Sequence, residues 1–273
     1  MMQFFSISPL KMLISLWRNR SLMRALVHRE VVGRYRGSVM GLFWSFFNPV
    51  LMLLIYTFVF SVVFKMRWNV GSDSKSEFAM VLFPGLIVFS LFSECLNRAP
   101  SLILTNVNYV KKVVFPLEIL PCVALGSVAF HGAVSLFVWF VAYLFLFGVP
   151  HLTVVLIPLA LLPLLLFTLG VSWFLASLGV YLRDVSQFMG MITTVLMFLS
   201  PIFYPVDKFP EKYRSLLYLN PITPAIEQAR DVLFWGKVPD LWFLLIYLLL
   251  GAIVAWCGFA WFQKTRRGFA DVL

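Results

Sequence analysis

Long apolar runs without a charged side chain occupy most of this sequence. The 64 residues between Glu118 and Arg183 contain no Asp, Glu, Lys or Arg, whereas a helix of about 20 apolar residues is enough to cross a bilayer. Gly and Pro within residues 148–151 supply a turn that divides this stretch in two. The pattern therefore predicts six membrane-spanning helices, over residues 41–64, 78–93, 119–147, 152–182, 185–206 and 241–263.

Two of the six predicted helices are irregular. Residues 78–93 are few for a full crossing, so we expect this helix to extend by a turn at one end. Pro201 and Pro205 each lack a backbone N–H, so we expect the fifth helix to break near its periplasmic end.

An amphipathic helix is predicted ahead of the first span. Ser8 and Pro9 are typical of a helix start, and apolar residues then recur at i, i+3, i+4 and i+7 opposite polar ones. Such a helix suits the cytoplasmic membrane interface; a helix that covers a soluble core is the alternative. The apolar residues are Leu10, Leu13, Ile14 and Trp17, and the polar ones are Lys11, Ser15 and Arg18.

Two further segments have patterns of their own. Small residues occur four apart ahead of the first span, at Gly33, Gly37, Gly41 and Ser45. They predict a face on which another helix can pack closely. Local backbone flexibility is the alternative. Residues 207–240 predict two short re-entrant helices in the outer leaflet, the second ended by Gly236. Their apolar faces comprise Phe209, Tyr213, Leu216 and Leu217, and then Ile226, Ala229 and Leu233.

Composition and charge place the chain in a membrane. Hydrophobic residues make up 61% and charged residues 12%, against about 45–50% and about 25% in soluble domains. Three scattered cysteines form neither a disulfide framework nor a metal site. The sequence therefore predicts an all-α integral membrane protein rather than a soluble enzyme.

The distribution of basic residues predicts the topology. The segments 1–40, 94–118, 183–184 and 264–273 carry 14 of the 22 Lys and Arg residues, so the positive-inside rule places them and both termini in the cytoplasm. This topology explains the net charge of +10 without a nucleic-acid partner. We divide the chain into a cytoplasmic amphipathic and basic segment (1–40), a six-span domain (41–263) and a cytoplasmic tail (264–273).

Motifs for several kinds of chemistry are missing from the sequence. It contains no GxxxxGK[ST], HExxH or DxD pattern, and the predicted spans hold no carboxylate between their ends. We therefore expect no catalytic residue, metal site or cofactor in this chain, and expect uphill transport to draw its energy from another polypeptide. We interpret His131, which lies within a span, as hydrogen-bonded inside the bundle.

Three sequence blocks, in order along nearly the whole chain, carry a family resemblance. They are Arg29-Glu30-x3-Arg34-Tyr35-Arg36-Gly37-Ser38-x2-Gly41-x2-Trp44-x3-Asn48-Pro49; Asn108-x2-Lys111-Lys112-x2-Phe115-Pro116-x2-Ile119-Leu120-Pro121; and Ser200-Pro201-x2-Tyr204-Pro205 with Asn220-Pro221-x-Thr223-Pro224 and Arg230. The chain resembles the polysaccharide-export permeases, which are transmembrane subunits of type-2 ABC transporters for O-antigen, capsule or teichoic acid. Glu30 stands where this family often has Asp.

The resemblance implies a function and partners. It implies a homodimer with two copies of a separate ATPase that binds ATP and Mg, in the bacterial inner membrane. The expected substrate is an undecaprenyl-pyrophosphate-linked polysaccharide, with O-antigen ahead of capsule, teichoic acid, lipid or drug export. A membrane glycosyltransferase and a passive channel are the alternatives from other classes.

Four groups of candidate site residues follow from the pattern and the resemblance. The first group is four aromatic residues that fall within roughly an 80° arc of the first span, at 100° per residue: Phe46, Tyr56, Phe60 and Phe64. Together with Tyr204 they are candidates for the lining of a substrate channel. Packing between spans is the alternative. Arginines that bind phosphate bidentately are assigned to the lipid-pyrophosphate entrance: Arg29, Arg34 and Arg36. The proline-bounded cytoplasmic segment is assigned to ATPase coupling, a passive loop being the alternative: Asn108, Tyr109, Lys111, Lys112, Phe115 and Pro116. The periplasmic gate comprises Pro201, Pro205, Tyr213, Asn220, Pro221 and Arg230.

Overall fold

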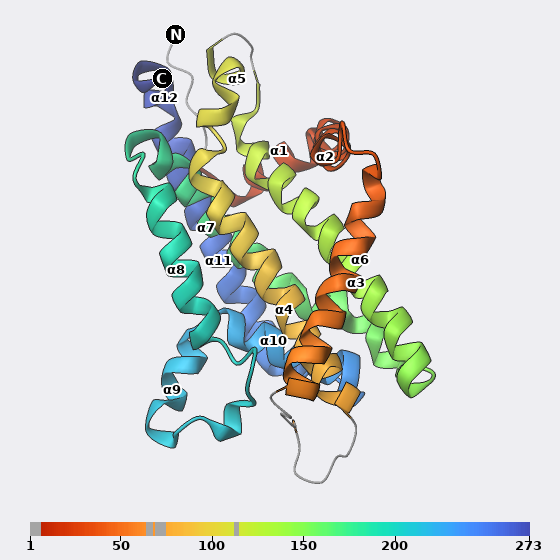
Figure 1. The fold of residues 1–273 in the computed structure, drawn as a ribbon. Helices are drawn as coiled ribbons and strands as arrows, with labels where there is room; N and C mark the ends of the chain where they lie inside the picture. The colour runs from red at the N-terminus through yellow and green to blue at the C-terminus, as the bar shows by residue number, and fades with distance from the viewer. Residues whose placement is uncertain (1–6, 64–67, 69–74, 112–114) are drawn as a thin grey trace.

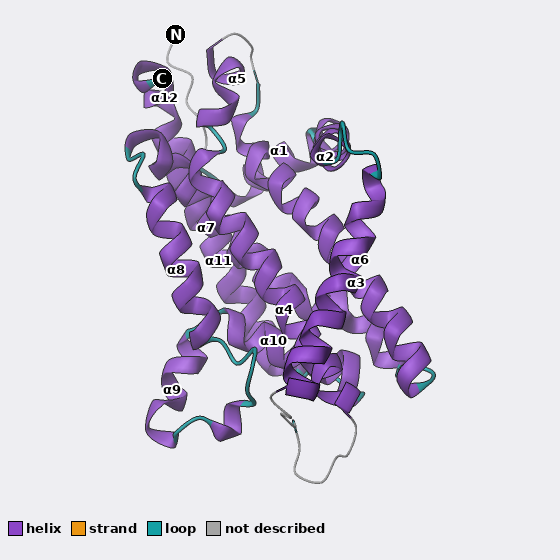
Figure 2. Cartoon of the chain, in the orientation of Figure 1, coloured by secondary structure: helices purple, strands orange, loops and turns teal. Residues whose placement is uncertain are grey.

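Helices make up the computed structural model, which describes residues 7–63, 68, 75–111 and 115–273. No strand occurs in these described ranges (Figure 2). The α-helices are α1 (Pro9–Arg18), α2 (Arg20–Arg34), α3 (Trp44–Tyr56), α4 (Lys75–Arg98), α5 (Val107–Lys111), α6 (Leu120–Phe147), α7 (Ile157–Tyr181), α8 (Val185–Leu199), α9 (Glu211–Leu219), α10 (Ile222–Arg230), α11 (Leu241–Thr265) and α12 (Phe269–Val272).

The long helices run between two distinct ends of the molecule. Helices α3, α4, α6, α7, α8 and α11 form the bundle, with α1, α2, α5 and α12 at one end and α9 and α10 at the other (Figure 1). The first and last described helices thus lie at the same end. This is the arrangement that an even number of passes produces.

Five helical segments are long and apolar enough to cross a membrane. They are Gly41–Phe60, Ser76–Ser101, Leu117–Phe147, Leu152–Tyr181 and Leu241–Val272. The second is longer than predicted, extending beyond residues 78–93 at both ends.

The predicted fifth span, 185–206, is wrong in its extent. Helix α8 has 15 residues and ends at Leu199, and at 1.5 Å per residue it is about 22 Å long against about 30 Å of hydrocarbon. Ser200, which precedes Pro201, has extended backbone angles (φ −97°, ψ 146°). A residue before proline disfavours the helical region, so the helix breaks at the prolines, as predicted, but it does so ahead of both of them.

Helix α4 occupies the centre of the bundle and α3 its periphery. In α4, 78% of the most apolar stretch is buried, against 6% in the segment that contains α3. Pro84 lies inside α4 and cannot donate to the carbonyl four residues earlier. That carbonyl, of Met80, accepts a hydrogen bond from Trp139 Nε1 at 2.9 Å instead, which ties α4 to α6.

Glycines let α7 and α11 pack backbone to backbone. A Cβ atom added to Gly258 would lie 2.0 Å from the carbonyl oxygen of Gly170, and one added to Gly170 would lie 2.3 Å from that of Val254. Close approach at small residues is typical of packing between membrane helices.

The predicted small-residue face ahead of the first span is wrong. Gly33 belongs to α2, whereas Gly37 (φ +88°) and Gly41 (φ +51°) have left-handed backbone in the turn that follows. A Cβ on any of these three would meet nothing within 4 Å. Gly37 and Gly41 therefore shape the turn between α2 and the first span, which agrees with the alternative of local backbone freedom.

The N-terminal helix is amphipathic as predicted. Helix α1 begins at Pro9, and the four predicted apolar residues point away from the protein, with Leu10 65% and Trp17 71% exposed, whereas Met12 and Leu16 pack against the core. On the opposite side, Ser15 Oγ donates a hydrogen bond to Glu118 at 2.8 Å.

Two short helices occur between the last two bundle helices, as predicted. Helix α10 is buried against α4 and α7, and its residues Ile226 and Ala229 have no exposed surface. It continues into a π-helix, Asp231–Trp235, which ends at Gly236 in the left-handed conformation (φ +66°).

Candidate functional site

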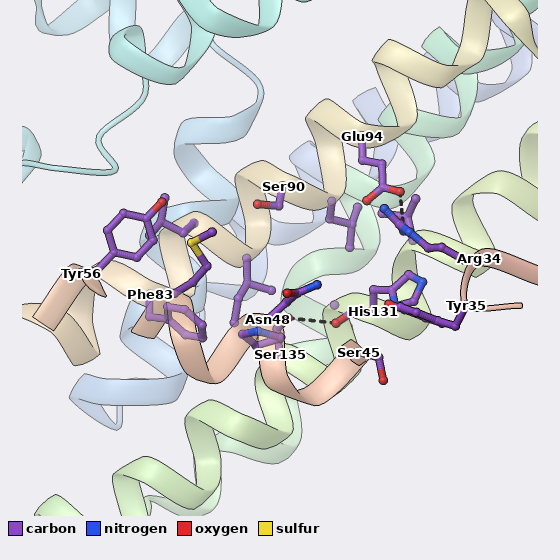
Figure 3. A pocket seen from close by; sticks show the side chains of 17 residues that line it. Arg34, Tyr35, Ser45, Asn48, Tyr56, Phe83, Ser90, Glu94, His131 and Ser135 are labelled. Atoms are coloured by element: carbon purple, nitrogen blue, oxygen red, sulfur yellow. Dashed lines mark hydrogen bonds and ion pairs between the residues drawn. The ribbon is translucent and has the colours of Figure 1, made fainter. Parts of the chain in front are cut away.

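A hollow of about 380 Å³ lies between α3, α4 and α6, beneath the end of α2. Figure 3 shows polar side chains on its walls, with Arg34 and Glu94 at one edge and Tyr56 and Phe83 toward the other. Its volume is in the range of small-molecule sites. The other polar residues that line the hollow, besides the two tyrosines, are Ser45, Asn48, Ser90, His131 and Ser135.

His131 differs from its predicted state. Its Nε2 atom is buried and has no hydrogen-bond partner among the residues that the structure describes. The ring instead packs edge-on against Tyr35, with centroids 5.8 Å apart. Burial raises the pKa of the Tyr35 phenol, partly opposed by Arg34, so this hydroxyl stays neutral beside the hollow.

Four charged side chains from α2 and α4 alternate in sign at the edge of this hollow. Arg34 Nη1 lies 2.8 Å from Glu94 Oε1, and Arg98 Nη1 lies 3.7 Å from the same oxygen. Arg98 Nη2 also donates to Glu30 Oε1. Their side chains are 28–46% exposed. We call these four residues the charge cluster.

A second hollow, of about 420 Å³, lies on the other side of this cluster. Its lining includes all four residues of the charge cluster, together with Gly33 and Ser127. Because both hollows share Arg34 and Glu94, this ion pair forms part of the wall between them.

The three arginines predicted at the lipid entrance do not lie together. Arg34 borders both hollows. Arg29 donates from Nη1 to the Tyr109 hydroxyl at 3.0 Å, which places it at the predicted coupling segment. Arg36 is exposed and lines neither hollow.

The predicted channel aromatics do not share one wall. Tyr56 lines the hollow, Phe46 packs edge-on against Phe137, and Phe60 stacks on Phe203 with centroids 5.7 Å apart. Residues Thr57–Val63 form a π-helix, so the 100° periodicity behind the predicted arc ends at Tyr56. Phe64 lies outside the described residues.

The predicted coupling segment contacts α2 through Tyr109 and the C-terminal residue through Lys111. The rings of Tyr109 and Phe115 stack with centroids 4.3 Å apart, and Lys111 Nζ donates to the backbone oxygen of Leu273. Asn108 and Pro116 flank this stack; Asn108 is exposed and Pro116 is half-buried. Lys112 lies outside the described part of the chain.

Glu118 joins four elements at this end of the molecule. Its carboxylate accepts from Arg266 Nη1 at 2.6 Å and from Ser15 at 2.8 Å, and its carbonyl accepts from Trp173 Nε1 at 2.8 Å. Arg266 Nη2 also donates to the Phe115 carbonyl at 2.7 Å. The side chains of Glu118 and Arg266 are only 9% and 14% exposed.

Arg230 performs a similar role at the opposite end. This buried side chain donates to the carbonyls of Val81 (3.0 Å), Pro201 (2.6 Å) and Ile202 (2.7 Å). Its guanidinium carbon lies 4.3 Å from the centroid of the Trp68 ring, a cation–π geometry. Arg230 thus holds the segment after α8 against α4 and α10.

Two of the remaining gate candidates, Asn220 and Pro221, extend this contact. Asn220 Nδ2 donates to Ser200 Oγ at 2.8 Å, and the carbonyl of Pro221 accepts from the Tyr247 hydroxyl. Pro205 precedes the short 3-10 helix Val206–Lys208. Tyr213 belongs to α9, but its side chain is outside the described set.

Tyr204 makes its contacts within its own segment. Its hydroxyl donates to the Phe198 carbonyl at 2.9 Å, in the last turn of α8. Its ring stacks on Phe209 with centroids 5.7 Å apart. The side chain therefore folds the segment after α8 back on the end of that helix.

Comparison with known proteins agrees with this architecture. Residues 21–234 match the family described as ABC-2 type transporter. The O-antigen export system permease protein RfbA of Myxococcus xanthus is 30% identical over 96% of this chain and 99% of its own length. A Klebsiella pneumoniae protein of the same name is 27% identical over 97% and 99%, and the polysialic acid transport protein KpsM of Escherichia coli is 23% identical over 79% and 82%. The chain belongs to the ABC-2 type transporter family.

Proposed function

We propose that this chain is the transmembrane subunit of an exporter that moves an undecaprenyl-pyrophosphate-linked polysaccharide, O-antigen foremost, across the bacterial inner membrane. The observation that carries the proposal is the similarity to two O-antigen export permeases along 96–97% of the chain. Export of a capsular polysaccharide is the second candidate, since relatives named for polysialic acid and capsule export also match, at 23% identity.

Energy comes from two copies of a separate ATPase, which bind ATP and Mg. The coupling segment around α5 supports this part of the proposal, because it lies at the end of the bundle with α1 and α12 and contacts both chain ends through Arg29 and Lys111. The excess of basic residues in the segments at this end supports a cytoplasmic location for both termini.

A second copy of the chain completes the channel. Helix α3 is peripheral, and α8 is short and exposes large apolar residues such as Phe188 and Met191. Two-fold pairing buries the same patch on both subunits. Polymer then moves between two copies rather than through one bundle, and α9 and α10 form re-entrant elements of the outer gate.

Deletion of the gene tests the exported class directly. Cells that lack the chain are expected to accumulate undecaprenyl-linked polysaccharide on the cytoplasmic leaflet and to lose it from the surface, and a plasmid copy should restore export. Lipid-linked glycans extracted from each strain are compared by mass spectrometry and surface polymer by antibody. Normal surface polymer in the deletion strain contradicts the proposal.

Cysteine crosslinking tests the coupling end. In a background without Cys95, Cys122 and Cys257, cysteines at Asn108 or Lys111 are expected to crosslink to the ATPase, with yields that change between nucleotide states. A cysteine at Lys208, exposed at the opposite end, is the matched control. Equal yields from the two ends, or none from α5 in any nucleotide state, contradict the assignment.

Tyr204, which lies between the gate prolines Pro201 and Pro205, tests the outer gate; an interfacial anchor is the alternative role. Tyr204→Phe loses the bond to Phe198 but keeps the stack on Phe209, so we expect a loss of about 1 kcal/mol in stability and near-normal export. Tyr204→Ala also loses the ring and is expected to reduce export or to raise the ion conductance of proteoliposomes. Unchanged conductance and export in a well-expressed Ala variant reject the gate role.

A further inference from the structure

The charge cluster has one carboxylate placed between two arginines. Glu94 Oε1 is within 2.8 Å of Arg34 and 3.7 Å of Arg98, and Arg98 also pairs with Glu30. Two guanidinium groups that converge on one oxygen form an anion site, and the anion that now occupies it belongs to the protein. All four side chains are partly exposed, so a ligand can reach them.

A diphosphate fits this pair of arginines better than a carboxylate does. Guanidinium groups bind phosphate oxygens through paired, charge-assisted hydrogen bonds, and a diphosphate offers more oxygens and more charge than Glu94. The Glu94 carboxylate is therefore a counter-ion that a diphosphate can displace from the two arginines.

The surroundings supply a place for the group next to the diphosphate. The hollow begins at Arg34 and Glu94, and among its largely apolar walls it presents hydroxyl and amide groups such as Ser90 and Asn48 (Figure 3). His131 Nε2 is buried beside it without a partner among the described residues. An unpartnered buried nitrogen is costly, and a sugar hydroxyl in the hollow would satisfy it.

We infer that Arg34 and Arg98 together form a diphosphate site, that Glu94 occupies this site when no substrate is bound, and that the sugar joined to the diphosphate lies in the hollow near His131. This inference rests on the proposed function and deepens it: Arg98 becomes a substrate-binding residue, and Glu94 and Glu30 set its selectivity. Substrate binding exchanges the Arg34–Glu94 contact for an Arg34–phosphate contact, so the same event opens the wall between the two hollows.

Glu94→Gln separates this inference from a structural role for the ion pair. If the pair only holds α2 against α4, removing its charge weakens the site. If Glu94 is a competing counter-ion, the amide keeps the shape and removes the competitor, so a diphosphate should bind more tightly.

Binding is measured on the purified complex with its ATPase in nanodiscs, with undecaprenyl diphosphate and undecaprenyl monophosphate as probes. Glu94→Gln is expected to tighten diphosphate binding about tenfold and Arg98→Ala to weaken it about tenfold, the size of one charge-assisted hydrogen bond. Arg98→Ala should also abolish the preference for the diphosphate, and Arg98→Lys should be intermediate. Arg24→Ala, an exposed arginine of the same helix as Arg34, is the control for net charge.

Two results overturn the inference. One is weaker diphosphate binding by Glu94→Gln with an unchanged unfolding temperature; the other is a loss in Arg24→Ala as large as that in Arg98→Ala. Either can occur while the deletion strain still accumulates lipid-linked polysaccharide, in which case the site fails and the proposed function stands. Normal surface polymer in the deletion strain would contradict the proposed function itself.

Discussion

Glu118→Ala is expected to lower the free energy of unfolding by about 3–5 kcal/mol, the usual cost of breaking one side of a buried ion pair. The substitution removes the buried counter-charge of Arg266 and the acceptor of Ser15. Glu118→Gln keeps an oxygen for one of these donors and should cost less. The measurement is denaturant unfolding of the purified protein in detergent.

Glu211→Ala is the matched control for this experiment. Glu211 lies 3.9 Å from Arg214 and is 89% exposed, and surface pairs of this kind contribute little. Equal stability of the two Ala variants would contradict the role of Glu118. Glu118 contacts α1 and the end of α11, and its partner Arg266 donates to the carbonyl of Phe115 in the coupling segment. Because Glu118→Ala loosens this connection between the coupling segment and the bundle, we expect the variant to export less polymer for each ATP that the complex hydrolyses.

The long helices were predictable from the sequence because membrane helices need long runs without charge. The start of α8 and its interruption by prolines were predictable as well, but its last residue was not, because a charge-free run gives no information on backbone angles. The helix ends at Leu199, since Ser200 precedes Pro201 and leaves the helical region. Likewise, the π-helix after Tyr56 changes the direction of every following side chain, and no simple periodicity reveals it.

The charge cluster illustrates what sequence patterns miss. The two i,i+4 pairs, Glu30 with Arg34 and Glu94 with Arg98, are visible as spacings at helix ends. Their convergence is not visible, since Arg34 and Glu94 are 60 residues apart and meet only when α2, packed on α6, brings its C-terminal end to α4. The same holds for Arg230, which the family pattern marks but whose carbonyl partners lie as far away as Val81.

Substitution of Arg230, at the opposite end of the bundle from Glu118, is expected to have the second large effect on stability. Its three donors hold carbonyls from α4 and from the segment after α8, and hydrogen bonds to charged groups contribute about 1.5–3 kcal/mol each. Since such bonds are not additive, Arg230→Met is expected to cost at least about 3 kcal/mol of stability. Lysine keeps the charge but loses the planar fork, so Arg230→Lys should be nearly as unstable.

Lys237→Ala supplies the control, because Lys237 forms an exposed pair with Asp231 at 3.5 Å close to Arg230 in sequence. We expect this variant to unfold like the wild type. If Arg230 fastens the outer gate, Arg230→Lys should also raise the ion conductance of reconstituted protein, because the Pro201–Ile202 segment is released from α4 while the bundle core is unchanged. If the Arg230→Lys variant is instead stable and does not conduct ions, a single positive charge is enough to hold the gate closed. The planar guanidinium group would then not be required.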